Sequence, residues 1–144
     1  MMNNKIRRLF NKACEDFDLI HNGDRILVGF SGGKDSLTLL HFLHCLRDSY
    51  HTKDINFSLI AAHIKFKNLP YSVDLSYLTK FCSDRKIEFR IVEDSIREDH
   101  LKSSTCVHCS RFRRAKLMEL SRIHNCNKLA LGHHLDDVVS TLLM

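Results

Sequence analysis

The stretch Arg25-Ile26-Leu27-Val28-Gly29-Phe30-Ser31-Gly32-Gly33-Lys34-Asp35-Ser36 decides the fold. Its first half is a short apolar run, which is typical of a buried parallel strand. Its second half is a glycine-rich turn with hydroxyls, one cation and one carboxylate, and the apolar residues after it recur at helical spacing. A strand, a glycine-rich turn and a helix form an anion site, because the first N–H groups of the helix and its dipole attract negative charge.

The spacing of the glycines excludes the two common nucleotide-binding loops. A Walker A loop needs four residues between its first glycine and the Gly-Lys pair, followed by Ser or Thr. Here three residues separate Gly29 from Gly33, and Asp35 occupies the Ser/Thr position. A dinucleotide fingerprint needs Gly-x-Gly-x-x-Gly, which does not occur. A phosphate loop of another class and a turn without a ligand remain as alternatives.

Length and composition indicate one globular domain. The chain has 144 residues, of which 44% are hydrophobic, and a net charge of +5 that suits a polyanionic partner. The N-terminus is amphipathic rather than a signal peptide, and no apolar run is long enough to cross a membrane. Six cysteines without an export signal indicate reduced thiols or metal ligands, so we expect a cytoplasmic protein.

Strand and helix patterns alternate along the chain. Apolar runs predict further strands over residues 56–64, 87–92 and 128–132, with helices between them. This alternation indicates an α/β fold, a parallel sheet with helices on both faces, in which right-handed crossovers favour the strand order 3-2-1-4. Residues 87–92 alternate between apolar and polar side chains, which indicates an edge strand.

The predicted helices differ in what their faces carry. The first, over residues 4–20, has an apolar stripe and a basic face that is either solvated or turned toward RNA. Ser72 is the expected cap of the helix after the second strand. The basic residues of the first helix are Lys5, Arg7, Arg8 and Lys12. The residues that a helix over 110–124 is expected to bury are Phe112, Ala115, Leu117, Leu120 and Ile123.

The chain ends inside an apolar helical pattern that begins at residue 138. We therefore expect residues 1–144 to form one C-terminally truncated domain, with the N-terminal helix at 4–20 and an incomplete nucleotide-binding core at 24–144. An open sheet edge and an unfinished helix lead us to expect low stability and self-association.

Ligands of such sheets bind at the carboxyl ends of the strands, near the point between strands 1 and 4 where the strand order reverses. This rule gathers residues 31–36, His63 and residues 132–137 around one crevice. Lys34 supplies a cation for a phosphate oxygen. The groups that complete the cradle are the hydroxyls of Ser31 and Ser36 and the N–H groups of Gly32 and Gly33.

Three carboxylates belong to the same crevice. Asp35 repels a bare phosphate, so its role there would be to hold Mg²⁺, which bridges phosphate oxygens. The alternative is a charge in the first turn of a helix. Asp136 and Asp137 open the last helix, where the same alternative stands beside a second Mg²⁺ or a substrate role.

Cys106 and Cys109 form a Cys-x-x-Cys pair with several readings. A zinc half-site needs a second pair, which this chain lacks, and a thioredoxin-like pair should follow a strand directly, whereas a polar loop precedes this one. An iron–sulfur site needs further ligands, and incidental cysteines are the remaining alternative. Three arginines beside the pair could stabilise an anionic cluster or contact phosphates: Arg111, Arg113 and Arg114.

Three motifs now stand in order: S-G-G-K-D-S at 31–36, C-V-H-C-S-R-F-R-R at 106–114 and G-H-H-L-D-D at 132–137. Together they resemble the tRNA 2-thiocytidine synthetase family (TtcA type) of the PP-loop ATP-pyrophosphatase superfamily. The resemblance covers nearly the whole chain. It implies an adenine nucleotide alpha hydrolase-like, Rossmann-like PP-loop fold and three cofactors or cosubstrates, namely ATP, Mg²⁺ and a 4Fe–4S cluster.

The resemblance also implies a reaction. The 2-oxygen of cytidine 32 in the tRNA anticodon loop attacks the α-phosphate of ATP, pyrophosphate leaves, and sulfur then displaces AMP. Lys34, Asp35 and Asp137 would be catalytic, Asp35 and Asp136 would hold Mg²⁺, and Cys106 and Cys109 would be two of three cluster ligands. The implied ATP contacts are Ser31, Gly32, Gly33, Lys34, Asp35, Ser36, His63 and Gly132. The implied tRNA contacts are Arg111, Arg113 and Arg114.

Partners and departures complete the expectation. The implied partners are tRNA, a sulfur donor (a cysteine desulfurase or sulfide) and a second copy in a homodimer, with no membrane. The family's third cluster cysteine lies beyond the last motif, and Cys126 is too close to a strand to replace it. Residues 64–67 also lack the Asp that relatives often carry. The alternatives are another PP-loop ligase, such as a tRNA(Ile)-lysidine synthetase, and a non-catalytic fragment that binds ATP or tRNA.

Overall fold

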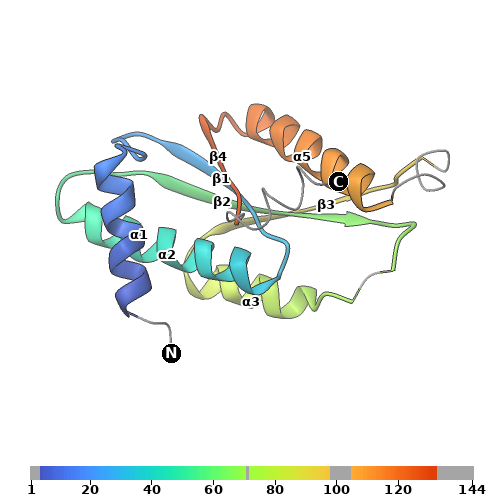
Figure 1. Cartoon of the computed structure of the whole chain (residues 1–144), viewed down its shortest axis with the longest axis horizontal. Coiled ribbons are helices and arrows are strands. Elements are labelled where there is room, and N and C mark those ends of the chain that lie inside the picture. Colours follow the sequence, from blue (N-terminus) through green and yellow to red (C-terminus); the bar gives the residue numbers. More distant parts are fainter. Residues whose placement is uncertain (1–3, 71, 98–104, 133–144) are drawn as a thin grey trace.

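The computed structural model describes residues 4–70, 72–97 and 105–132, with the backbone only for 105–108 (Figure 1). Four parallel strands form one sheet in the order β3-β2-β1-β4. The strands are β1 (Arg25–Gly29), β2 (Ser58–Phe66), β3 (Glu88–Asp94) and β4 (Lys128–Ala130). The predicted parallel sheet, its strand order and the edge position of the third strand are therefore confirmed.

The described helices lie on both faces of the sheet, as predicted (Figure 1). They are α1 (Asn4–Asp16), α2 (Lys34–His51), α3 (Leu75–Asp84) and α5 (Thr105–Ile123). One core joins α2 and α3 to the side chains of Val28 and Ala61, and the other joins α5 to those of Leu27 and Ile60. Neighbouring residues of each strand thus serve opposite faces, which explains the continuous apolar runs of β1 and β2. None of the helices in the described ranges is long and apolar enough to span a membrane.

β1 lies between two partners, and this decides where the glycine-rich loop emerges. Its last residue, Gly29, pairs with Ala62 of β2, and Val28 pairs with Ala130 of β4. The loop after β1 therefore leaves the sheet between the carboxyl ends of two neighbouring strands. This is the position that the strand order predicts for a ligand site.

Two helix boundaries differ from the sequence expectation because of capping. α1 ends at Asp16 instead of residue 20, since Asp18 takes a left-handed conformation (φ 50°) and the N–H of Leu19 donates to Cys14 O at 3.0 Å. Such an end usually carries glycine, so this helix end is hard to predict from the residue types. Ser72 is not the cap of α3; Asp74 is, and its side chain accepts from the N–H of Tyr77.

Two helices bury less than the sequence suggested. α1 packs on α2 through Phe10 and the buried Cys14, while other apolar residues of its stripe are exposed, among them Ile6, Leu9 and Phe17. In α5, Leu117 and Leu120 are buried and Phe112 is half-buried. The expected burial of Ala115 and Ile123 is wrong, because both side chains are exposed.

Polar contacts fasten the amino ends of β1 and β4. Asp24 is buried, accepts from the backbone N–H of His21 at 2.7 Å and from Asn127 Nδ2 at 2.8 Å, and pairs with Lys128. Burial alone would raise the pKa of Asp24, but these bonds outweigh it and lower the pKa to about 2. The carboxylate is therefore ionised at neutral pH, and it links the start of β1 to the start of β4.

Candidate functional site

The loop between β1 and α2 exposes the start of a helix. Gly33 is the N-cap of α2, with φ −73° and ψ 161°, and no side chain of the described residues caps the helix there. Gly32 has φ +89°, a conformation that residues with a Cβ rarely adopt. The N–H groups of the first turn of α2 are thus directed into the loop, and they are the donors that an anion requires.

Ser36 holds the loop in shape from inside. Its side chain is buried, and its hydroxyl donates to Gly33 O at 3.0 Å while accepting from the Gly32 N–H at 3.2 Å and from Ser31 Oγ at 3.1 Å. One hydroxyl therefore joins three points of the turn. Ser31 is exposed and remains the hydroxyl of the loop that faces outward.

Lys34 and Asp35 begin α2 and are both exposed. Lys34 makes no ion pair with any described residue, in contrast to surface lysines such as Lys12 and Lys80, each of which pairs with an Asp four residues away. An ammonium without a carboxylate partner, beside uncapped N–H groups, favours phosphate. Asp35 adds a carboxylate at the same helix start, where it could ligate Mg²⁺ on a phosphate.

Two other segments of the chain pack against the loop. A Cβ built on Gly132 would stand 3.1 Å from Ser36 N and 3.1 Å from the carbonyl carbon of Asp35. A Cβ on Gly32 would stand 2.9 Å from Val73 Cγ1, in the segment before α3. The structure therefore brings Gly132 to the loop, as the sequence predicted. The cover by Val73 was missed, because an isolated apolar residue in a loop gives no sign of a long-range contact.

His63 lies in the carboxyl-terminal half of β2, three residues before its end, and only 3% of it is exposed. Its Nδ1 is 2.8 Å from Phe30 O. A carbonyl only accepts, so Nδ1 carries the proton. Burial lowers the pKa of His63, the bond to Phe30 raises it, and the positive charges of Arg113 and Lys65 lower it again, with a net decrease. The ring is therefore neutral at pH 7 and held against the residue that enters the loop.

The cysteine pair lies in the first turns of α5. The sequence placed it in a loop before residue 110, but α5 begins at Thr105, so that boundary was wrong. Cys109 is half-buried and packs at the edge of the core between α5 and the sheet. The side chain of Cys106 lies outside the described residues.

Cys126 cannot complete this pair. It follows the carboxyl end of α5, beside Arg25 at the start of β1. α5 continues for 14 residues beyond Cys109, so at about 1.5 Å per residue its end at Ile123 lies about 20 Å from Cys109 along the helix axis, and Cys126 comes only after that end. Among the described residues, no three His, Cys, Asp or Glu side chains converge on a metal-sized site.

The three arginines that follow the cysteine pair in α5 do not share the same contacts. The guanidinium of Arg113 lies over the ring of Phe66, 5.3 Å from its centroid, near the carboxyl end of β2. All three arginine side chains are exposed. The contact with Phe66 places Arg113 toward the loop edge of the sheet. The predicted site residues Asp136 and Asp137 lie outside the described residues.

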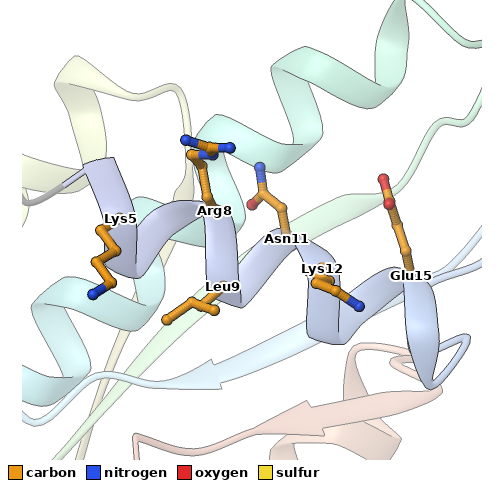
Figure 2. A pocket seen from close by; sticks show the side chains of 6 residues that line it. All are labelled: Lys5, Arg8, Leu9, Asn11, Lys12 and Glu15. Carbon is orange, nitrogen blue, oxygen red and sulfur yellow. The ribbon is translucent and has the colours of Figure 1, made fainter.

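A shallow hollow of about 520 Å³ lies on α1, away from the loop (Figure 2). Its six lining side chains all project from this one helix, as Figure 2 shows. Lys12 pairs with Asp16 at 2.5 Å, and Glu15 pairs with Lys53 at 3.7 Å, so part of the basic face is neutralised. The hollow contains none of the residues predicted for ATP or the cluster.

Known proteins with similar sequences modify tRNA. The chain is 42% identical to the tRNA-cytidine(32) 2-sulfurtransferase of Syntrophotalea carbinolica and 43% identical to that of Geobacter sulfurreducens. Each alignment covers 97% of this chain and 54% of the relative. The chain therefore spans about half the length of the curated relatives it matches.

Structural and family comparisons agree with the sequence comparison. The fold is similar to that of the U34-tRNA thiolase NcsA from Methanococcus maripaludis, whose structure contains a 4Fe–4S cluster. The TM-score is 0.78 at 29% identity, over 97% of this chain and 48% of the thiolase. The model of the PP-loop domain family matches residues 2–144. With its strand, phosphate loop and helix in the arrangement described above, the chain belongs to the PP-loop domain family.

Proposed function

We propose that this chain is the ATP-binding part of an enzyme that replaces the 2-oxygen of cytidine 32 in tRNA with sulfur. The observation that carries the proposal is the uncapped start of α2, where Lys34 stands without a carboxylate partner among the described residues. The tRNA-cytidine(32) 2-sulfurtransferases at 42–43% identity support the choice of substrate. Because the chain spans about half of those relatives, the activity is proposed for the whole enzyme.

The loop residues would bind and orient ATP. The first N–H groups of α2 and the ammonium of Lys34 would hold phosphate oxygens, and the carboxylate of Asp35 would hold Mg²⁺, which would neutralise phosphate charge. The tRNA oxygen attacks the α-phosphorus, the bond to pyrophosphate breaks, and the negative charge that develops is stabilised by the same donors. A sulfur nucleophile then attacks C2 of the base, and AMP leaves with the former 2-oxygen. Asp137 and Asp136 are proposed for catalysis and Mg²⁺ on sequence grounds alone.

The cysteine pair fits part of an iron–sulfur site. Cys106 and Cys109 are one helical turn apart at the start of α5, which suits two thiolate ligands, and the described residues supply no complete set. When bound, a 4Fe–4S cluster would present the sulfur at this edge of the sheet. The arginines of α5 are proposed to contact tRNA, Arg113 nearest the loop and Arg111 and Arg114 on the outer surface.

The chemistry also sets the partners. Thiolation consumes one sulfur atom per tRNA, so a cysteine desulfurase or free sulfide must supply it. Reduced thiols and the use of ATP and tRNA support the proposal that the reaction takes place in the cytoplasm. A homodimer is proposed as well, because three apolar side chains in and just after α1 are exposed, namely Ile6, Leu9 and Phe17.

The test is the affinity of the chain for Mg·ATP, measured by calorimetry in wild type and in Lys34→Ala. We expect at least a tenfold loss, about 1.4 kcal/mol, because the loop loses its cation. Lys80→Ala is the matched control, since Lys80 is also exposed on a helix but pairs with Asp84. Undiminished affinity in Lys34→Ala would mean that the loop is not the phosphate site.

A further inference from the structure

The entrance of the phosphate loop is held by a side chain of the neighbouring strand. The register of β1 and β2 ends at Gly29 and Ala62, and Phe30 N–H still donates to Ala62 O at 2.8 Å. Beyond this bond the chain turns into the loop. The carbonyl of Phe30 then accepts a hydrogen bond from Nδ1–H of His63, also at 2.8 Å.

Phe30 is thereby fixed at every polar group. Its N–H and its carbonyl are both bonded to β2, and its ring is buried against Phe81 and Phe89, with centroids 5.7 and 5.8 Å away. The next residue is Ser31, whose hydroxyl is bonded to Ser36. A rigid Phe30 therefore sets the direction in which the loop leaves the sheet.

The position of His63 argues against direct contact with a ligand. Only 3% of the residue is exposed, and the carbonyl that it binds belongs to the buried residue Phe30. A buried carbonyl that loses its donor is unfavourable, and the turn would shift to find another partner. A shift there moves the N–H groups of α2 that follow only a few residues later.

We propose that His63 is a positioning residue for the phosphate loop, which acts on nucleotide binding through the carbonyl of Phe30 rather than by touching the nucleotide. This inference rests on the proposed function, because it takes the loop to be the site of ATP. The imidazole of His63 thus replaces the next backbone hydrogen bond between β1 and β2, at the point where β1 has already turned away.

Three variants of the chain test the assignment by their affinity for Mg·ATP in calorimetry. His63→Asn keeps a donor, because the Asn amide nitrogen occupies the place of Nδ1, and its affinity should stay within about threefold of wild type. His63→Leu has no donor, and His63→Gln carries its amide one atom too far. Both should bind about tenfold more weakly while thermal unfolding still shows a folded protein. If His63→Leu does not fold, the polar His63→Gln variant supplies the comparison.

Two results would overturn the assignment. Equal affinity in all folded variants would show that the bond to Phe30 does not matter, and a loss in His63→Asn as large as in His63→Leu would show that the ring itself contacts the nucleotide. A ¹⁵N NMR spectrum of the wild-type imidazole needs no variant: we expect the Nδ1-protonated neutral tautomer at pH 7.5, and protonation at the other nitrogen would refute the bond. If wild type does not bind ATP at all, the proposed function itself fails, which is a separate outcome.

Discussion

Gly132 lies against the backbone of Asp35, so that a Cβ on Gly132 would stand 3.1 Å from the Asp35 carbonyl carbon and 3.2 Å from its oxygen. The second residue after β4 is thus in direct contact with the first turn of α2. Because β4 also pairs with β1, the phosphate loop is anchored on β1 where it begins, and the segment after β4 packs against it where α2 begins. The loop is therefore packed into the fold and is not an independent surface turn.

Gly132→Ala should therefore damage the site. Its Cβ would meet backbone atoms, which cannot rotate away as a side chain would, so α2 or β4 must shift. We expect a loss of about 1–3 kcal/mol in the free energy of unfolding, as for overpacked cores, together with weaker Mg·ATP binding. Urea unfolding and calorimetry measure the two effects. A variant with wild-type values of both would show that the end of β4 has room to move.

Gly33→Ala should separate ligand approach from packing. The nearest atom to a Cβ on Gly33 is Ser31 Oγ at 3.5 Å, an ordinary contact, and its φ of −73° suits any residue. We expect the free energy of unfolding to fall by less than about 1 kcal/mol, the usual effect at an N-cap. Mg·ATP affinity should nevertheless fall, because the new methyl group occupies the path of the phosphate. Unchanged affinity would place the phosphate elsewhere along the loop.

The sequence predicted the features that depend on local pattern. The apolar run of β1, the count of residues between Gly29 and Gly33 and the alternation of elements led to the right sheet, strand order and loop. The ends of helices were less predictable, because single residues decide them. Asp18 ends α1 in a conformation that usually needs glycine, and Asp74 rather than Ser72 caps α3.

The contacts that shape the site were out of reach of sequence reasoning for another reason. The bond from His63 to Phe30 joins residues 33 positions apart, and the contact of Gly132 with Asp35 joins two ends of the chain's core. His63 was predicted as a contact of ATP because it ends a strand, and a strand end says nothing about the direction of the ring. Only the packed sheet shows that the imidazole faces a carbonyl.

The cysteine pair should carry the iron. After anaerobic purification, Cys106→Ser and Cys109→Ser should each lower the iron and sulfide content, since both residues belong to the first turns of α5. Cys126→Ser is the matched control and should keep full iron, because it lies at the opposite end of α5. Far-UV circular dichroism should show all three variants folded. Full iron in both pair variants, or zinc alone in wild type, would contradict the cluster and favour a ligase without iron.

The Asp24 carboxylate should make stability depend on acid. Its pKa is lowered to about 2 in the folded protein, below the usual 3.8, so the unfolded chain binds the proton more readily. The stabilisation is full above pH 4 and is lost as pH falls toward 2, with a magnitude of about 2 kcal/mol. Urea unfolding between pH 2 and 6 should show this loss in wild type. Asp24→Asn should be less stable than wild type at pH 6, and its free energy of unfolding should depend less on pH below pH 4. An equally steep pH dependence in the variant would assign the acid sensitivity to other carboxylates.

His41 should also make the protein less stable in acid, but unlike Asp24 it contributes a buried group that the fold does not satisfy. Its Nδ1 is buried and has no hydrogen-bond partner among the described residues, and only its Nε2 approaches Cys45 Sγ, at 3.4 Å. Burial lowers the pKa of His41 below 6.5, and the positive charges of Arg85, His44 and Arg7 lower it further. The unfolded chain therefore takes up a proton at a higher pH than the folded protein does. Stability is retained above pH 6.5 and lost as pH falls below it.

His41→Leu removes both the unpaired nitrogen and the titration. We expect the variant to be more stable than wild type at pH 5.5 and the advantage to shrink at pH 8, where the unfolded imidazole is neutral. Some pH dependence should remain, because burial also lowers the pKa of His44. Thermal unfolding of both proteins at the two pH values measures the difference. Equal destabilisation of the variant at both pH values would mean that the contact with Cys45 and the packing of the ring matter more than the titration. The unpaired nitrogen would then have little effect on the stability of the fold.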